Sequence, residues 1–122
     1  MAEKTFNIGI KAEALFASVF DATTSRNHYP VRFKRLADRM QDCVSNIYCD
    51  AIDANEMPIN TQSRKDAKFD LQTRVISNCK KMLMLSKYSL EKKMISGATC
   101  ELWTGLIMDI KYMTLAWRSK NT

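Results

Sequence analysis

Apolar residues recur along most of the chain at steps of three, four and one, the spacing that places them on one face of an α-helix. The first such segment runs from about Thr5 to Ala22, and its apolar positions are Ile8, Ala12, Leu15, Phe16, Val19 and Phe20. A second segment begins at Pro30, which suits the first helical turn because it has no N–H to leave unpaired. It fades between Asn55 and Pro58, and its apolar face consists of Leu36, Met40, Cys43, Val44, Ile47, Ala51 and Ala54.

Two more helical segments follow a loop between Pro58 and Ser63. The third begins near Thr61 or Ser63, because either hydroxyl can accept a hydrogen bond from the first helical turn. Its stripe is Phe69, Gln72, Ile76, Cys79, Leu83 and Ser86. The fourth begins after Ser96 and Gly97, and its stripe is Trp103, Leu106, Ile107, Ile110, Met113, Thr114 and Trp117. Seven-residue steps within that stripe resemble a heptad seam, so we expect Trp103 and Leu106 in the core.

The connections between these segments are short, so successive helices are expected to be antiparallel neighbours. The pattern predicts an all-α, up-down-up-down four-helix bundle that forms a single domain over residues 1–122. A three-helix bundle with a frayed first segment is the alternative. The 46% apolar and 26% charged residues are an ordinary globular mixture, and the scarcity of turn residues favours helices. With only 3 glycines and 2 prolines, the chain has fewer turn residues than most β architectures need.

The cysteines and the N-terminal stretch indicate in which cellular compartment the protein resides. Cys43, Cys49, Cys79 and Cys100 lack C-x-x-C spacing, and His28 is the single histidine, so a zinc site is not expected. Cysteines within apolar helical patterns are expected to pack as free thiols, which indicates a reducing, cytoplasmic location. Charged residues interrupt the apolar N-terminal stretch, which argues against a signal peptide. No run approaches the roughly 20 apolar residues of a membrane span, so no membrane partner is expected.

Sequence motifs for catalysis are missing. The chain has no glycine-rich phosphate loop, no H-E-x-x-H and no nucleophile elbow, and one histidine leaves few ways to build a Ser-His or Cys-His pair. We therefore expect a protein that is not an enzyme and has no cofactor, metal site or catalytic residue. Asp109, between Ile107 and Ile110, is expected to pair with a cation of another helix.

The net charge of +6 is unevenly distributed along the chain. In the predicted bundle, the first and third connections lie at one pole, beside the start of the second helix and the end of the third. Two basic stretches meet there, Arg26, Arg32, Lys34, Arg35 and Arg39 in one and Lys80, Lys81, Lys87, Lys92 and Lys93 in the other. Asp50, Asp53 and Glu56 are expected near the opposite pole. A concentrated basic patch attracts phosphates, although such charges also serve as a solubilising face.

The candidate nucleic-acid-binding residues are therefore Arg26, Arg32, Lys34, Arg35, Arg39, Lys80, Lys81 and Lys87. Three of them, Arg32, Arg35 and Arg39, share one helix face, and arginine holds phosphates in a bidentate way that lysine does not. His28 and Tyr29 border the patch, where they either stack on an exposed base or close the end of the core. No base-reading motif is present, so contacts are expected to be mainly to phosphates.

Several fragments of the last three helices occur in a familiar order. They are the basic start from His28-Tyr29-Pro30 to Arg39, Ala54-Asn55-Glu56, Asn78 to Leu83, Glu101 to Leu106, and Met113 to Lys120. Together, over about residues 26 to 120, they resemble the four-helix-bundle proteins of bacterial mobile elements. The most similar are the accessory variability determinant (Avd) proteins of diversity-generating retroelements. Trp117 with Arg118 matches a tryptophan near the family's C-terminal helix end, although the glycine-rich stretch that often precedes it is Met113 to Ala116 here.

This resemblance implies a basic, barrel-like homopentamer of four-helix subunits that binds nucleic acid and the element's reverse transcriptase. Such accessory proteins support mutagenic cDNA synthesis and do no chemistry themselves. The resemblance also matches Arg32 and Arg35 to the basic start of the family's second helix. A homo-oligomer is further indicated by apolar residues that fall outside the helical stripes, namely Ile52, Leu71, Met84, Leu102 and Met108.

The sequence therefore predicts a non-enzymatic accessory protein that binds RNA and a reverse transcriptase partner. Two alternatives remain open. One is a DNA-binding accessory protein of plasmid or transposon mobilisation, and the other is a helical scaffold with no nucleic-acid role.

Overall fold

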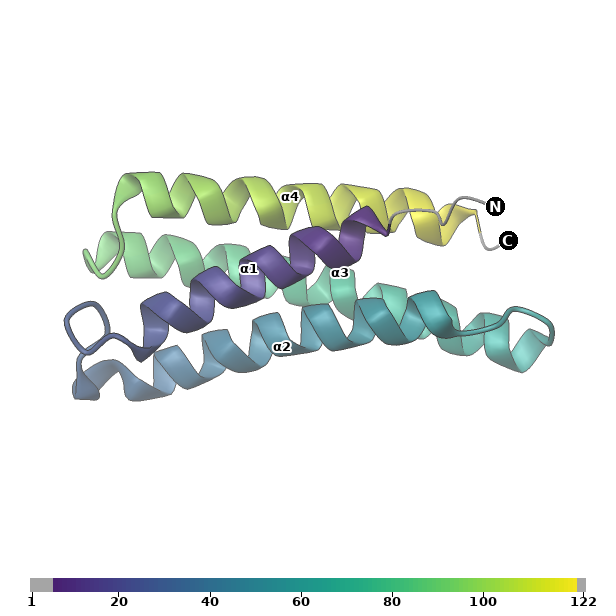
Figure 1. Ribbon diagram of the computed structural model, residues 1–122, viewed down its shortest axis with the longest axis horizontal. Helices are drawn as coiled ribbons and strands as arrows, with labels where there is room; N and C mark the ends of the chain where they lie inside the picture. The colour runs from purple at the N-terminus through teal and green to yellow at the C-terminus, as the bar shows by residue number, and fades with distance from the viewer. Residues whose placement is uncertain (1–5, 121–122) are drawn as a thin grey trace.

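A computed structural model describes residues 6–120 and shows four packed α-helices (Figure 1). The elements are α1 (Asn7–Thr24), a short 3-10 turn (Val31–Phe33), α2 (Lys34–Glu56), α3 (Gln62–Glu91) and α4 (Gly97–Ser119). The described residues contain no strand, so the predicted all-α four-helix bundle is confirmed. The predicted first-helix start at Thr5 lies outside the described residues, within which α1 begins at Asn7.

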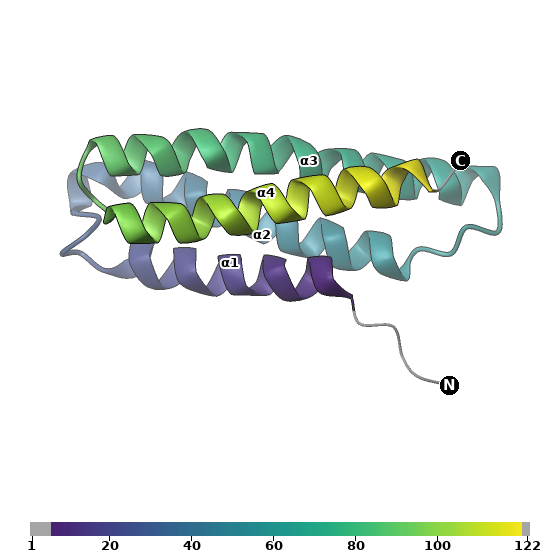
Figure 2. The ribbon, with the colours of Figure 1, turned by 90° about the horizontal axis from the view of Figure 1, so that it is seen from above.

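Each helix packs against two others in the order α1, α2, α3, α4 and back to α1. The α1–α2 and α3–α4 connections lie at the same end of the bundle, at the left of Figures 1 and 2. Successive helices are therefore antiparallel, as expected. The three-helix alternative is wrong, because α1 contributes Leu15 and Val19 to the core with no exposed surface.

Two of the predicted helix starts are confirmed by side-chain caps. Thr61 Oγ1 accepts a hydrogen bond from the backbone N–H of Arg64 at 3.2 Å, and Ser96 Oγ accepts from that of Thr99 at 3.1 Å. Each hydroxyl satisfies a backbone donor that has no partner within the helix.

The predicted start of the second helix at Pro30 is wrong by one turn. Phe33 has φ −107° and ψ 18°, outside the α-helical region, so α2 begins only at Lys34. Before it, the N–H of Phe33 donates to the carbonyl of Pro30 at 2.8 Å, which closes a 3-10 turn.

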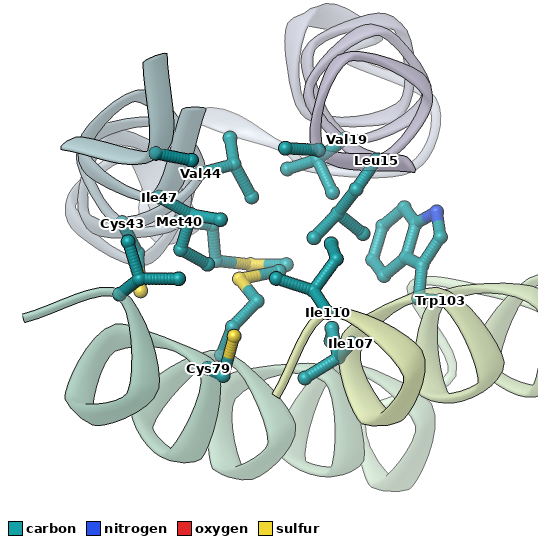
Figure 3. Close-up of a cluster of buried hydrophobic side chains, with 14 of the residues drawn as sticks. Leu15, Val19, Met40, Cys43, Val44, Ile47, Cys79, Trp103, Ile107 and Ile110 are labelled. Carbon is teal, nitrogen blue, oxygen red and sulfur yellow. The ribbon is translucent and has the colours of Figure 1, made fainter. Parts of the chain in front are cut away.

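The core runs along the middle of the bundle, and Figure 3 shows its central layers. Its largest fully buried side chain is Trp103 of α4, as predicted. The indole N–H of Trp103 donates to Ser18 Oγ of α1 at 2.8 Å, so the ring is packed and its polar atom is satisfied. Met40 and Ile47 from α2 and Ile107 from α4 complete this centre without exposed surface.

Three expectations about apolar positions need correction. Leu106 is only partly buried, because the next residue, Ile107, occupies the centre of the bundle. Phe69 is 42% exposed and lies beneath the Arg118 guanidinium, whose carbon is 4.9 Å from the ring centroid. Leu71, which was expected to face a neighbouring molecule, is 8% exposed and packs in the bundle. The stripe of α3 is therefore displaced at its N-terminal end.

Other positions follow the expected pattern. Tyr29 is 4% exposed and closes the loop end of the core, whereas His28 is exposed. Lys11 of α1 and Asp109 of α4 form the expected inter-helix pair at 3.0 Å, on the surface rather than within the seam. Within residues 6–120, no helix has a stretch long and apolar enough to cross a lipid bilayer.

The four cysteines are free thiols in three kinds of environment. Cys43 and Cys79 are buried between α2 and α3 (Figure 3), as expected of small apolar side chains. Cys100 is half-buried. Cys49 is exposed, contrary to the expectation, because the neighbouring positions Ile47 and Ala51 face the core instead.

Candidate nucleic-acid interface

All eight candidate basic residues are exposed. Arg26 lies in the α1–α2 loop and Arg32 in the 3-10 turn, while Lys34, Arg35 and Arg39 occupy the first two turns of α2. The other three, Lys80, Lys81 and Lys87, lie in the C-terminal half of α3. Since α2 and α3 are antiparallel, the basic start of α2 lies beside the basic end of α3 (Figure 1).

Three of these cations line a single groove between α2 and α3. Arg35 and Arg39 come from α2 and Lys81 from α3, and the groove has a volume of about 550 Å³. No ion pair joins any of the three to a carboxylate within residues 6–120. Unpaired cations in a concave surface focus the positive potential, which is the arrangement that attracts a phosphate.

A second, smaller hollow of about 170 Å³ holds Arg26 and Lys34 between the end of α1 and the start of α2. Lys34 is partly neutralised there, because its Nζ lies 3.4 Å from Asp38 Oδ2. Arg32 stands outside both hollows, over the ring of its neighbour Phe33 at 5.2 Å. The predicted basic pole is therefore divided, and three of its cations lie in the α2–α3 groove together with the carboxylates of Asp38 and Asp42.

The floor of the α2–α3 groove is neutral. The thiol of Cys43 donates to the backbone carbonyl of Asn78 at 3.1 Å. Burial raises the pKa of Cys43 to about 11, against the opposing influence of Lys81 and Arg39. The sulfur is therefore a protonated hydrogen-bond donor at neutral pH rather than a nucleophile.

Sequence reasoning did not assign the other seven lining residues of the groove to the candidate site, namely Asp38, Asp42, Cys43, Asn46, Asn78, Met84 and Leu85. The α2 wall of the groove could have been recognised from the sequence. Its residues Arg35, Arg39, Asp42 and Asn46 follow steps of four, three and four along one face of α2. The contribution of α3 depends on its register against α2, and no spacing within either segment gives that register.

The opposite end of the bundle has mixed charges. Asp50, Asp53 and Glu56 end α2 there as expected, but Arg64, Lys65 and Lys68 begin the adjacent α3. Asp50 Oδ2 lies 3.6 Å from Arg74 Nε, and burial raises the pKa of its carboxyl, although Arg74 acts in the opposite direction. Carboxylates and cations offset one another here. The end with the α1–α2 and α3–α4 connections, called the loop end below, is therefore the more strongly basic pole.

The residues that carried the C-terminal part of the Avd resemblance lie at this mixed end. Phe6 packs edge-on against Trp117 with ring centroids 5.4 Å apart, and Lys68 Nζ lies 5.2 Å from the same indole ring. Arg118 donates from Nη1 to Thr73 Oγ1 at 3.0 Å. Trp117 and Arg118 thus hold α4 against α1 and α3, away from the groove.

Comparison of the chain with models of protein families, with curated proteins and with solved structures finds no match in any of the three. Among residues 6–120, no three His, Cys, Asp or Glu side chains are grouped closely enough to hold a metal ion.

Proposed function

We propose that this chain is a non-enzymatic accessory protein that binds nucleic acid, preferably RNA, through the basic loop end of its bundle. The observation that carries the proposal is the convergence of Arg35, Arg39 and Lys81 on one groove, unpaired with any carboxylate of the described residues. A nucleic-acid backbone supplies the regularly spaced negative charge that such a groove attracts.

The assignment to a diversity-generating retroelement, with a reverse transcriptase as protein partner, rests on the resemblance of residues 26 to 120 to the Avd proteins. In that setting the basic end holds the template RNA while another surface docks the polymerase. The protein does no chemistry, and a cytoplasmic location follows from the same setting.

A homo-oligomer, with the pentamer of the resemblance as its expected form, is part of this proposal. The outer faces of α1 and α4 expose Ile10, Leu102 and Tyr112, each more than half accessible to solvent. Helices that are apolar on their outer as well as their inner face are normally covered by another chain. The α1–α4 side is therefore the subunit contact, and the α2–α3 groove remains open.

The double reversal Arg35→Glu with Arg39→Glu tests the nucleic-acid role. Binding to labelled RNA should weaken at least tenfold at physiological salt, and the dependence of log Kd on log salt should flatten, since fewer phosphates are engaged. Arg64→Glu with Lys120→Glu makes the same charge change at the mixed end and should have much less effect. Circular dichroism should show unchanged helix content in both variants.

The same variants separate the competing functions. A loss of affinity for single-stranded DNA but not RNA indicates the mobilisation accessory. If the groove reversal abolishes binding to the reverse transcriptase while RNA binding survives, the groove is a protein-docking surface. If neither interaction changes, the proposal is wrong and a helical scaffold is the better description.

A further inference from the structure

The α2–α3 groove changes in chemical character along its length. Its α2 wall begins with Arg35, Asp38 and Arg39 near the end with the α1–α2 connection and continues with Asp42 and Asn46 toward the middle of the bundle. From Arg35 to Asn46 this wall covers 12 residues, which is about 16 Å of helix. A purely electrostatic phosphate groove needs only the cations, so the polar continuation requires a separate explanation.

The polar groups at the inner part of the groove are free to bind a ligand. The carboxylate of Asp42 and the amide of Asn46 are exposed and make no hydrogen bond or ion pair with the described residues. Their neighbours differ, since Asp38 pairs with Lys34, and the amide of Asn78 donates to the carbonyl of Arg74 at 3.0 Å. A carboxylate and an amide one helical turn apart present two acceptor oxygens beside a donor N–H.

The α3 wall supplies an apolar surface opposite these groups. Met84 is 73% exposed, the largest exposed fraction among the apolar side chains with substantial exposure in residues 6–120, and Leu85 beside it is half-buried. A methionine so exposed contributes little to the core. Its polarizable thioether is well suited to packing against the face of an aromatic ring.

We propose that the groove binds one unpaired nucleotide of a single strand and favours guanine. The phosphate lies against Arg35, Arg39 and Lys81, and the base lies over Met84. This inference rests on the proposed nucleic-acid function and adds base preference to it. The volume of about 550 Å³ lies within the range of sites that hold small ligands.

Guanine fits the inner polar groups better than uracil or thymine does. Its Watson–Crick edge carries a ring N–H and an amino group, which both donate to the Asp42 carboxylate, and a carbonyl oxygen that accepts from the Asn46 amide. Uracil and thymine present two carbonyl oxygens, one of which would face Asp42 without a proton between them. Unpaired bases expose this edge, whereas a duplex hides it.

The test compares two labelled RNA 12-mers by fluorescence anisotropy, oligo(U) and the same strand with two central guanines. The guanine strand should bind about 5- to 100-fold more tightly, as expected for one bidentate contact to a base. Asp42→Asn should reduce the ratio of the two affinities to about one and leave the salt dependence of binding unchanged. Because the variant also removes a negative charge that repels every strand, the ratio of the two affinities is the measurement.

Asp38→Asn is the matched control, since it makes the same charge change in the same groove. It should strengthen binding to both strands alike and keep their ratio. Met84→Ala is a second variant whose exposed position does not endanger folding, and it should weaken binding to both strands without altering the salt slope. If Asp38→Asn instead abolishes the guanine preference, the assignment to Asp42 is overturned.

The remaining outcomes distinguish this inference from the function on which it rests. Equal, salt-dependent binding to both strands overturns the guanine site and leaves the nucleic-acid role intact. An absence of saturable binding to either strand overturns both. If free GMP binds as tightly as the guanine strand, the groove is a mononucleotide site and the single-strand proposal is wrong.

Discussion

The two sides of the bundle share one core and differ in their outer surfaces. The α2–α3 side is grooved and highly charged, whereas the α1–α4 side carries few charged residues. The charged residues of α1 and α4 are only Lys11, Glu13, Asp21, Glu101, Asp109, Lys111 and Arg118. Because the core needs one face of every helix, the difference lies in what each helix presents outward, and we propose that binding takes place on that surface.

The largest expected effect comes from Trp103, which α4 contributes to the centre of the core. Trp103→Ala should lower the free energy of unfolding by about 3–5 kcal/mol, because it leaves a large cavity and removes the partner of Ser18 Oγ. Met84→Ala on the charged side should change it by less than about 0.5 kcal/mol, since that side chain is exposed. Urea denaturation measures both, and equal losses would contradict the described burial.

The second prediction concerns assembly through the α1–α4 side. Leu102→Glu with Tyr112→Glu should convert the expected oligomer into a monomer of 14.0 kDa, because two buried charges would be left unpaired in the contact. Ser63→Glu with Ser77→Glu adds the same charge to exposed positions of α3 and should leave the assembly intact. Light scattering distinguishes these outcomes, and a wild-type monomer at high micromolar concentration would refute the homo-oligomer.

The fold could be predicted from sequence because its signal is local and repeated. Steps of three and four identify each helix, and Thr61 and Ser96 mark two starts through hydroxyls that cap their own backbone. The errors lie where tertiary contacts override the pattern. Phe69 packs against Arg118 of α4, and no spacing within α3 predicts that contact.

The candidate site could be predicted only in part. Clustering of cations at one pole follows from helix order alone, so Arg35, Arg39 and Lys81 were placed near one another correctly. Lys34 lines the other hollow because consecutive residues of a helix point about 100° apart, and Arg26 joins it from the α1–α2 loop. Asp42 and Asn46 become candidate binding residues only because the α3 wall lies opposite them in the groove.

The third prediction uses the thiols between α2 and α3 as an internal probe. Burial raises the pKa of Cys43 to about 11 and that of Cys79 to about 12. The folded state therefore holds these protons more tightly than the unfolded state, in which the thiol pKa is 9.0. The resulting stabilisation is complete below pH 9 and is lost as pH rises through the folded-state values.

Denaturation at pH 8 and pH 10.5 measures this effect. Wild type should lose more stability between the two pH values than Cys43→Ala with Cys79→Ala does. At pH 8, Cys49 should react first with a thiol reagent, and Cys43 and Cys79 only after unfolding. Rapid reaction of all four thiols in the native protein would show that the α2–α3 side opens far more readily than the packing indicates.

The smallest expected effect belongs to the ion pair that joins α1 to α4. Lys11 Nζ and Asp109 Oδ2 are 3.0 Å apart, but the two side chains are 35% and 55% exposed, so water and salt screen their attraction. Asp109→Asn should cost less than about 1 kcal/mol at low salt and less still at 1 M salt. Urea denaturation at low salt and at 1 M salt measures the contribution of this pair. A loss of several kcal/mol that persists at high salt would mean that the packing of α1 against α4 also depends strongly on charge. That result would contradict the difference between the two sides.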